Sequence, residues 1–146
     1  MKKNFTLLSY FVIALTLVFT ACKKDDDVSP EQEKINQLNG IWTINSATTP
    51  NGNVDLTGVT ITFSGENTTY SLSGLNTLED NNLNHSDVFA ARGSFSLNAN
   101  NLNEMTLDPG DVVTINVSDA SLTLNYSSAF PKASDSEENI TLTATK

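Results

Sequence analysis

The stretch Val59-Thr60-Ile61-Thr62-Phe63 alternates apolar side chains with threonines, and this alternation indicates the fold class. Successive side chains of a β-strand point to opposite faces of the sheet, so the stretch has one apolar face and one hydroxyl face. A strand of this kind buries one face in a core and leaves the other in water. The stretch therefore predicts an antiparallel sheet built around a single core.

The same period of two recurs on both sides of this stretch, and we find no helical period after residue 37. The other predicted strands lie within residues 38–48, 69–73, 88–97, 102–107, 113–117, 122–126 and 140–144. Turn-forming pairs such as Asn51-Gly52 and Pro109-Gly110 separate them. About eight strands with turns roughly every 8 to 12 residues are typical of a β-barrel or a β-sandwich.

Short connections between consecutive strands favour an all-β, antiparallel, up-and-down barrel, because closure removes exposed sheet edges. A β-sandwich of the immunoglobulin type is the alternative, and pairing between the first and last strands would distinguish the two. The asparagine-rich residues 74–87 are expected to form a long loop, with or without a short strand, and residues 127–139 are expected to form a second, polar loop. Residues 28–36 are expected to form either a short helix running toward Leu38 or an extended tether.

The first 21 residues predict an export signal. Met1-Lys2-Lys3-Asn4 is basic, and residues 5–21 carry no charge and end in small side chains. A transmembrane anchor is the alternative. It would need roughly 20 apolar residues, whereas serine and threonine interrupt this run.

Cys22 is the only cysteine, so no disulfide can form within the chain. Phe19-Thr20-Ala21-Cys22 resembles the lipobox of bacterial lipoproteins, in the looser form found in Bacteroidetes with phenylalanine in place of leucine. The resemblance implies cleavage before Cys22 and acylation of its thiol and new amino terminus. Several acyl chains would hold the protein on a membrane, since each buried methylene contributes about 0.8 kcal/mol. An ordinary signal followed by an incidental cysteine is the alternative.

The residues after the cysteine, Lys23-Lys24-Asp25-Asp26-Asp27, resemble the lipoprotein export signal of Bacteroidetes. That resemblance implies a lipid-anchored protein at the bacterial outer membrane or cell surface; the alternative is a solvated linker. We therefore expect a signal peptide at residues 1–21, a lipidated polar tether at residues 22–36 and a barrel domain at residues 37–146.

The start of the predicted barrel, Leu38-Asn39-Gly40-Ile41-Trp42, resembles the Gly-x-Trp opening of lipocalins, and the later strands resemble the small lipocalin-like domains of Bacteroidetes lipoproteins. The resemblance implies an eight-stranded barrel whose base is closed by Trp42. Lipocalins usually carry a basic residue near the C-terminal end that packs over this tryptophan. Arg92 and Lys132 are the interior candidates here, and neither stands at the matching place.

The composition argues against several functions. The formal net charge of −9 repels phosphate backbones, so no nucleic acid partner is expected. His85 is the only histidine and lies in a polar stretch, so a Ser-His-Asp triad or a histidine metal site is not expected. Asp108, Asp111 and Asp119 lack the spacing of a calcium-binding loop. We expect no metal, no cofactor and no enzymatic activity.

Two binding hypotheses follow from these observations. In the first, the barrel interior holds a small hydrophobic ligand against inward-facing aromatic residues, namely Trp42, Phe63, Tyr70, Phe89, Phe95 and Tyr126. These rings would otherwise simply fill the core, since an eight-stranded barrel is just wide enough for either. In the second, the protein is an accessory surface lipoprotein that binds a protein or glycan through residues 74–87 and 127–139. The sequence specifies neither the ligand nor the oligomeric state.

Overall fold

The computed structural model describes residues 28–84, 87–108, 110–129 and 137–146. The predicted signal peptide, Cys22 and the first part of the predicted tether lie outside these residues.

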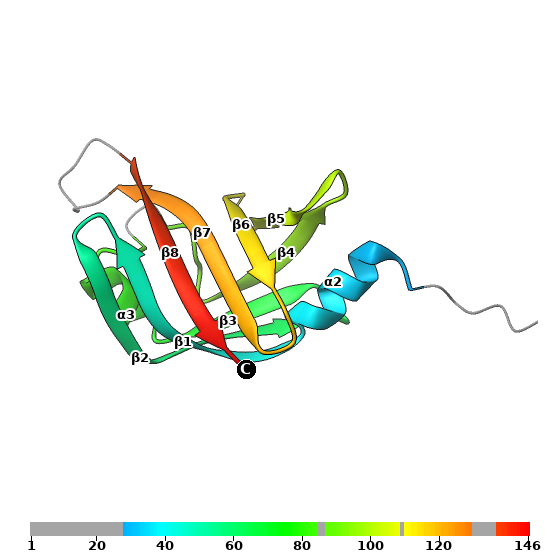
Figure 1. Cartoon of the computed structure of the whole chain (residues 1–146), viewed down its shortest axis with the longest axis horizontal. Helices are drawn as coiled ribbons and strands as arrows, with labels where there is room; N and C mark the ends of the chain where they lie inside the picture. Colours follow the sequence, from blue (N-terminus) through cyan, green and yellow to red (C-terminus); the bar gives the residue numbers. More distant parts are fainter. Residues whose placement is uncertain (1–27, 85–86, 109, 130–136) are drawn as a thin grey trace, which may run out of the picture.

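Eight strands, within the described residues, follow one another around a closed antiparallel barrel (Figure 1). In chain order the elements are α2 (Pro30–Leu38), β1 (Gly40–Thr49), β2 (Gly52–Ser64), β3 (Thr69–Ser73), α3 (Leu75–Asp80), β4 (Arg92–Asn98), β5 (Asn101–Leu107), β6 (Val112–Val117), β7 (Ser121–Ala129) and β8 (Glu137–Thr145). Each strand pairs with the next one along the chain, so the predicted up-and-down order is confirmed.

Pairing between the first and last strands closes the barrel. Ser46 of β1 lies opposite Thr143 of β8, and Ala47 lies opposite Leu142. A β-sandwich would leave these strands in separate arrangements with exposed edges. The barrel is therefore confirmed, and the sandwich alternative is wrong.

The alternation in the sequence sorts each strand into an inner and an outer face. Val59, Ile61 and Phe63 are buried, whereas Thr60 and Thr62 between them are only half-buried. The inner faces of the other strands, and the apolar residues of both helices, join the same core cluster. The prediction of a single core is confirmed.

Helix α2 resolves the two expectations for the stretch before the barrel. The Ser29 side chain caps it by accepting a hydrogen bond from the Gln32 backbone N–H at 3.2 Å, and Pro30 occupies its first turn. Ile35 and Leu38, spaced by three residues, are both buried in the barrel core. The helix, rather than the extended tether, is therefore present from Pro30 onward.

Residues 74–87 differ from the expected long loop, because they contain helix α3. Figure 1 shows α3 and α2 at opposite sides of the barrel. Leu78 of α3 and Leu83 beyond it are fully buried. The helix has only 6 residues, too few to establish a helical period in the sequence.

Strand β4 is shorter than the predicted strand at residues 88–97, because it begins at Arg92. The backbone N–H and C=O of Phe89 bind the side chain of Asn84 instead of a neighbouring strand. Strands β7 and β8 in turn are longer than predicted, since Ser127 pairs with Asn139 within the stretch expected to be a loop.

Candidate functional site

The six aromatic residues expected to contact a ligand are all buried in the barrel core. Their exposed fractions are 0% for Trp42, 1% for Phe63, 2% for Tyr70 and Phe89, and 4% for Phe95 and Tyr126. Only their inward direction was predictable, because alternation assigns a face and says nothing about contacts.

Five of these rings form two groups. The Phe63 ring packs edge-to-face on Phe95 with centroids 5.4 Å apart and lies 6.5 Å from the Tyr70 ring. The Phe89 ring packs edge-to-face on Tyr126 at 5.1 Å. Edge-to-face pairs are favourable contacts in their own right. These rings are thus in contact with one another and, at exposed fractions of 1–4%, have little surface free for a ligand.

The buried tyrosine hydroxyls fasten irregular segments to the barrel. Tyr126 donates a hydrogen bond to the carbonyl oxygen of Leu83, which follows α3. Tyr70 accepts one from the Ala90 backbone N–H at 3.1 Å and donates one to the Asp108 carbonyl oxygen at 3.3 Å. Burial raises the pKa of Tyr126 well above its ordinary value of 10.0, and burial is also the main cause of the raised pKa of Tyr70.

Asn84 holds the segment before β4 in place. Its side chain is 1% exposed. Its amide nitrogen donates to the Phe89 carbonyl oxygen at 2.8 Å, and its amide oxygen accepts from the Phe89 N–H at 2.9 Å. Asn84 could not be singled out from the sequence, because an asparagine among several asparagines carries no signal of burial.

Lys146 is the basic residue that packs over Trp42. Its Nζ lies 4.7 Å from the centre of the indole ring and donates a hydrogen bond to the Gln37 carbonyl oxygen at 3.1 Å. The Trp42 indole N–H in turn donates to the Leu38 carbonyl oxygen at 2.7 Å. The expectation that no basic residue stands at this place is wrong.

Period two would have found Lys146, because it continues the inward series Ile140, Leu142 and Ala144. Of the earlier candidates, Arg92 is exposed on the outside of the barrel, and Lys132 lies outside the described residues. Gly40 leaves room for the lysine, since an added Cβ would come within 2.7 Å of the Lys146 Cε atom.

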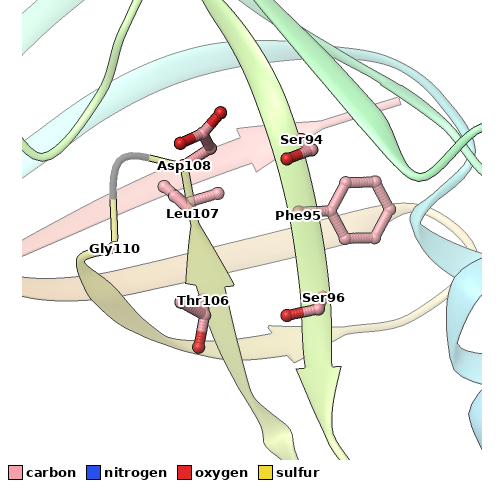
Figure 2. A pocket seen from close by; sticks show the side chains of 7 residues that line it. All are labelled: Ser94, Phe95, Ser96, Thr106, Leu107, Asp108 and Gly110. Carbon is pink, nitrogen blue, oxygen red and sulfur yellow. The ribbon is translucent and has the colours of Figure 1, made fainter.

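Two depressions lie on the outer wall of the barrel. One, of about 370 Å³, crosses β4 and β5 and is lined by Ser94, Phe95, Ser96, Thr106, Leu107, Asp108 and Gly110. Figure 2 shows Ser94 and Ser96 pointing to the side of the strand opposite Phe95. The other, of about 460 Å³, crosses β2, β3 and β4 and is lined by Thr62, Ser64, Thr69, Tyr70, Ser71, Arg92 and Gly93.

The acidic candidates do not assemble into a metal site in the described part of the chain. No group of three or more His, Cys, Asp or Glu side chains there could hold a metal ion, so Asp108, Asp111 and Asp119 do not form one. His85 lies outside the described residues. No helix in residues 28–84, 87–108, 110–129 or 137–146 is long and apolar enough to cross a bilayer.

No model of a known protein family matches this chain, and no curated protein matches it.

Proposed function

We propose that this protein is an exported lipoprotein, anchored by acyl chains on Cys22 to the bacterial outer membrane or cell surface, whose lipocalin-like barrel binds its partner through the outer wall. The observation that carries the binding part is the close packing of the aromatic rings inside the barrel. Five of the six candidate aromatics contact one another in the core, and the two depressions described above lie outside it.

The anchoring part is supported by sequence. The lipobox-like residues end at Cys22, and an acidic cluster follows directly. Beyond them, helix α2 begins at Pro30 and packs against the barrel core through Ile35. Acyl chains on Cys22 would therefore hold the barrel close to the membrane surface.

A Cys22→Ala variant tests the anchor. We expect wild-type protein to incorporate a labelled fatty acid and to fractionate with membranes, and the variant to do neither. Ser9→Ala, a change of similar size within the predicted leader, is the matched control and should behave like the wild type. A Cys22→Ala variant that is still acylated and membrane-bound would contradict the proposal.

A small hydrophobic ligand inside the barrel is the second candidate function. It is favoured by the position of the Phe89–Tyr126 pair, because Phe89 precedes β4 and makes no strand pairing that a ligand would break. Native mass spectrometry of the purified protein separates the two candidates. A stoichiometric apolar molecule would support the interior site and contradict binding by the outer wall alone.

A further inference from the structure

The depression across β2, β3 and β4 combines hydroxyl groups with a guanidinium group on the outside of the barrel. Thr62 lies opposite Ser71, and Ser71 lies opposite Arg92, so these three form one row across the strands. Ser64 and Thr69 form a second row beside it. The volume of about 460 Å³ falls within the roughly 300–1,000 Å³ of small-molecule sites.

Apart from the Tyr70 hydroxyl, the polar side chains that line this depression have no partners within the described part of the protein. Neither the Arg92 guanidinium nor the side-chain hydroxyls of Thr62 and Ser71 bond to another described residue. The same holds for the hydroxyls of Ser64 and Thr69. These side chains are therefore available to a ligand, in a depression whose exposed lining is otherwise mostly apolar.

The wall formed by β1, β7 and β8 is different, although it is equally rich in hydroxyls. There Ser46 bonds to Thr143 at 2.9 Å, and Thr141 donates to Asn125 at 2.6 Å. Side chains that bond to one another offer fewer groups to a ligand. Among the described residues, unpartnered hydroxyls also line the β4–β5 depression, at Ser94, Ser96 and Thr106, so Arg92 is what distinguishes the β2–β3–β4 depression.

Arg92 determines which charge this wall attracts. It is the only arginine in a chain of formal net charge −9. The other described cations are engaged, since Lys34 donates to Asn103 at 3.3 Å and Lys146 covers Trp42. A guanidinium binds a carboxylate through two parallel hydrogen bonds. One cation in an acidic protein suits a group of single negative charge better than a phosphate monoester, which carries about −1.5 to −2.

We propose that the β2–β3–β4 depression binds an acidic oligosaccharide, with a uronate carboxylate on Arg92 and sugar hydroxyls on the Thr62, Ser64, Thr69 and Ser71 side chains. Protein hydroxyls both donate and accept, as sugar hydroxyls do, and threonine methyl groups can contact the apolar edges of a sugar ring. This inference rests on the proposed function, because it specifies the ligand of the outer wall.

Calorimetric titration of the full chain in detergent tests the inference with a trisaccharide that carries a single uronate, such as glucuronosyl-xylobiose. The methyl ester of the same trisaccharide removes the negative charge and keeps the sugar hydroxyls. We expect the free acid to bind and the ester to bind at least about tenfold more weakly, because hydrogen bonds to charged groups contribute about 1.5–3 kcal/mol. Arg92→Gln should weaken binding of the acid by a similar factor. Lys34→Gln, which removes the same charge from helix α2, is the matched control and should change the affinity by less than about twofold.

Two further variants distinguish specific hydrogen bonding to the sugar from non-specific attraction between opposite charges. Arg92→Lys keeps the positive charge but loses the planar guanidinium that can donate two parallel hydrogen bonds. Its affinity for the acid should lie between those of the wild type and Arg92→Gln. Thr62→Val removes one hydroxyl at nearly constant volume and should weaken binding severalfold. Absence of binding, equal binding of acid and ester, or equal loss in Arg92→Gln and Lys34→Gln would each overturn the inference. The proposed function would fail separately, on the Cys22 fractionation or on an apolar ligand found by mass spectrometry.

Discussion

The two hydrogen bonds between the Asn84 side chain and the Phe89 backbone lead to a prediction for the stability of the barrel. Asn84→Ala removes a side chain that is 1% exposed and that binds both backbone polar groups of Phe89. Phe89 is itself 2% exposed, so water cannot easily replace the lost partner. The substitution therefore leaves a buried N–H and a buried C=O unpaired.

The expected cost follows from those two groups. An unsatisfied buried donor or acceptor costs about 1–3 kcal/mol, so Asn84→Ala should lower the free energy of unfolding by about 2–5 kcal/mol. Asn84→Asp separates the two bonds, because a carboxylate still accepts from the Phe89 N–H but can no longer donate to the Phe89 carbonyl. We expect it to be destabilised as well, since it also buries a charge.

Urea unfolding followed by the fluorescence of Trp42, the only tryptophan, measures this change. Asn81→Ala is the matched control. Its amide donates one hydrogen bond to the Thr77 carbonyl oxygen at 2.8 Å from a half-buried position, so its loss should cost about 1 kcal/mol or less. A cost for Asn84→Ala within about 0.5 kcal/mol of the control would refute the reasoning.

Three other predictions concern the base of the barrel and its pH dependence. Gly40→Ala should lower the free energy of unfolding by about 1–3 kcal/mol in urea titrations, because Gly40 has φ of +126° and an added Cβ would come within 2.7 Å of the Lys146 Cε atom. Gly52→Ala, at a φ of +117° with no atom of the described residues within 4 Å of the added Cβ, is its comparison and should cost less. Trp42→Phe should cost about 2–4 kcal/mol by the same assay, since it leaves a gap and removes the indole donor from the Leu38 carbonyl; an unchanged midpoint would contradict this. The raised pKa of Tyr126 means that the unfolded chain loses this proton first, so the stability that the tyrosine contributes is fully present below about pH 10 and declines above it. In denaturant titrations from pH 8 to 11, the free energy of unfolding should decline more steeply for the wild type than for Tyr126→Phe. Equal slopes would contradict the raised pKa of Tyr126.

Much of the fold was predictable from local pattern. The alternation in Val59–Phe63 identified an apolar inner face, and the same rule placed five of the six aromatic candidates inside the barrel. Phe89 is buried as well, but outside any strand and next to buried Val88. Helix α2 was accessible through its cap, Ser29-Pro30. Helix α3 was not, because a helix of 6 residues is held by the burial of Leu78 rather than by a local pattern.

The candidate site was less predictable, because its contacts join residues that are far apart in the chain. Lys146 reaches Trp42, and the Tyr126 hydroxyl reaches the Leu83 carbonyl oxygen. The row of Thr62, Ser71 and Arg92 depends on the register of three strands. Register and closure are long-range properties, whereas period two reports only on which face each side chain lies.

In the stretch Val59–Phe63, some features follow from the order of the residues and others from the folded arrangement of the strands. Its residue order alone determined that the strand has an apolar and a hydroxyl face, because neighbouring side chains of an extended backbone must point in opposite directions. Closure between β1 and β8 decided that the apolar face lies inside a barrel and not between two sheets. The strand neighbours then decided which hydroxyls bond to other side chains and which, like that of Ser71 opposite Arg92, have no partner among the described residues.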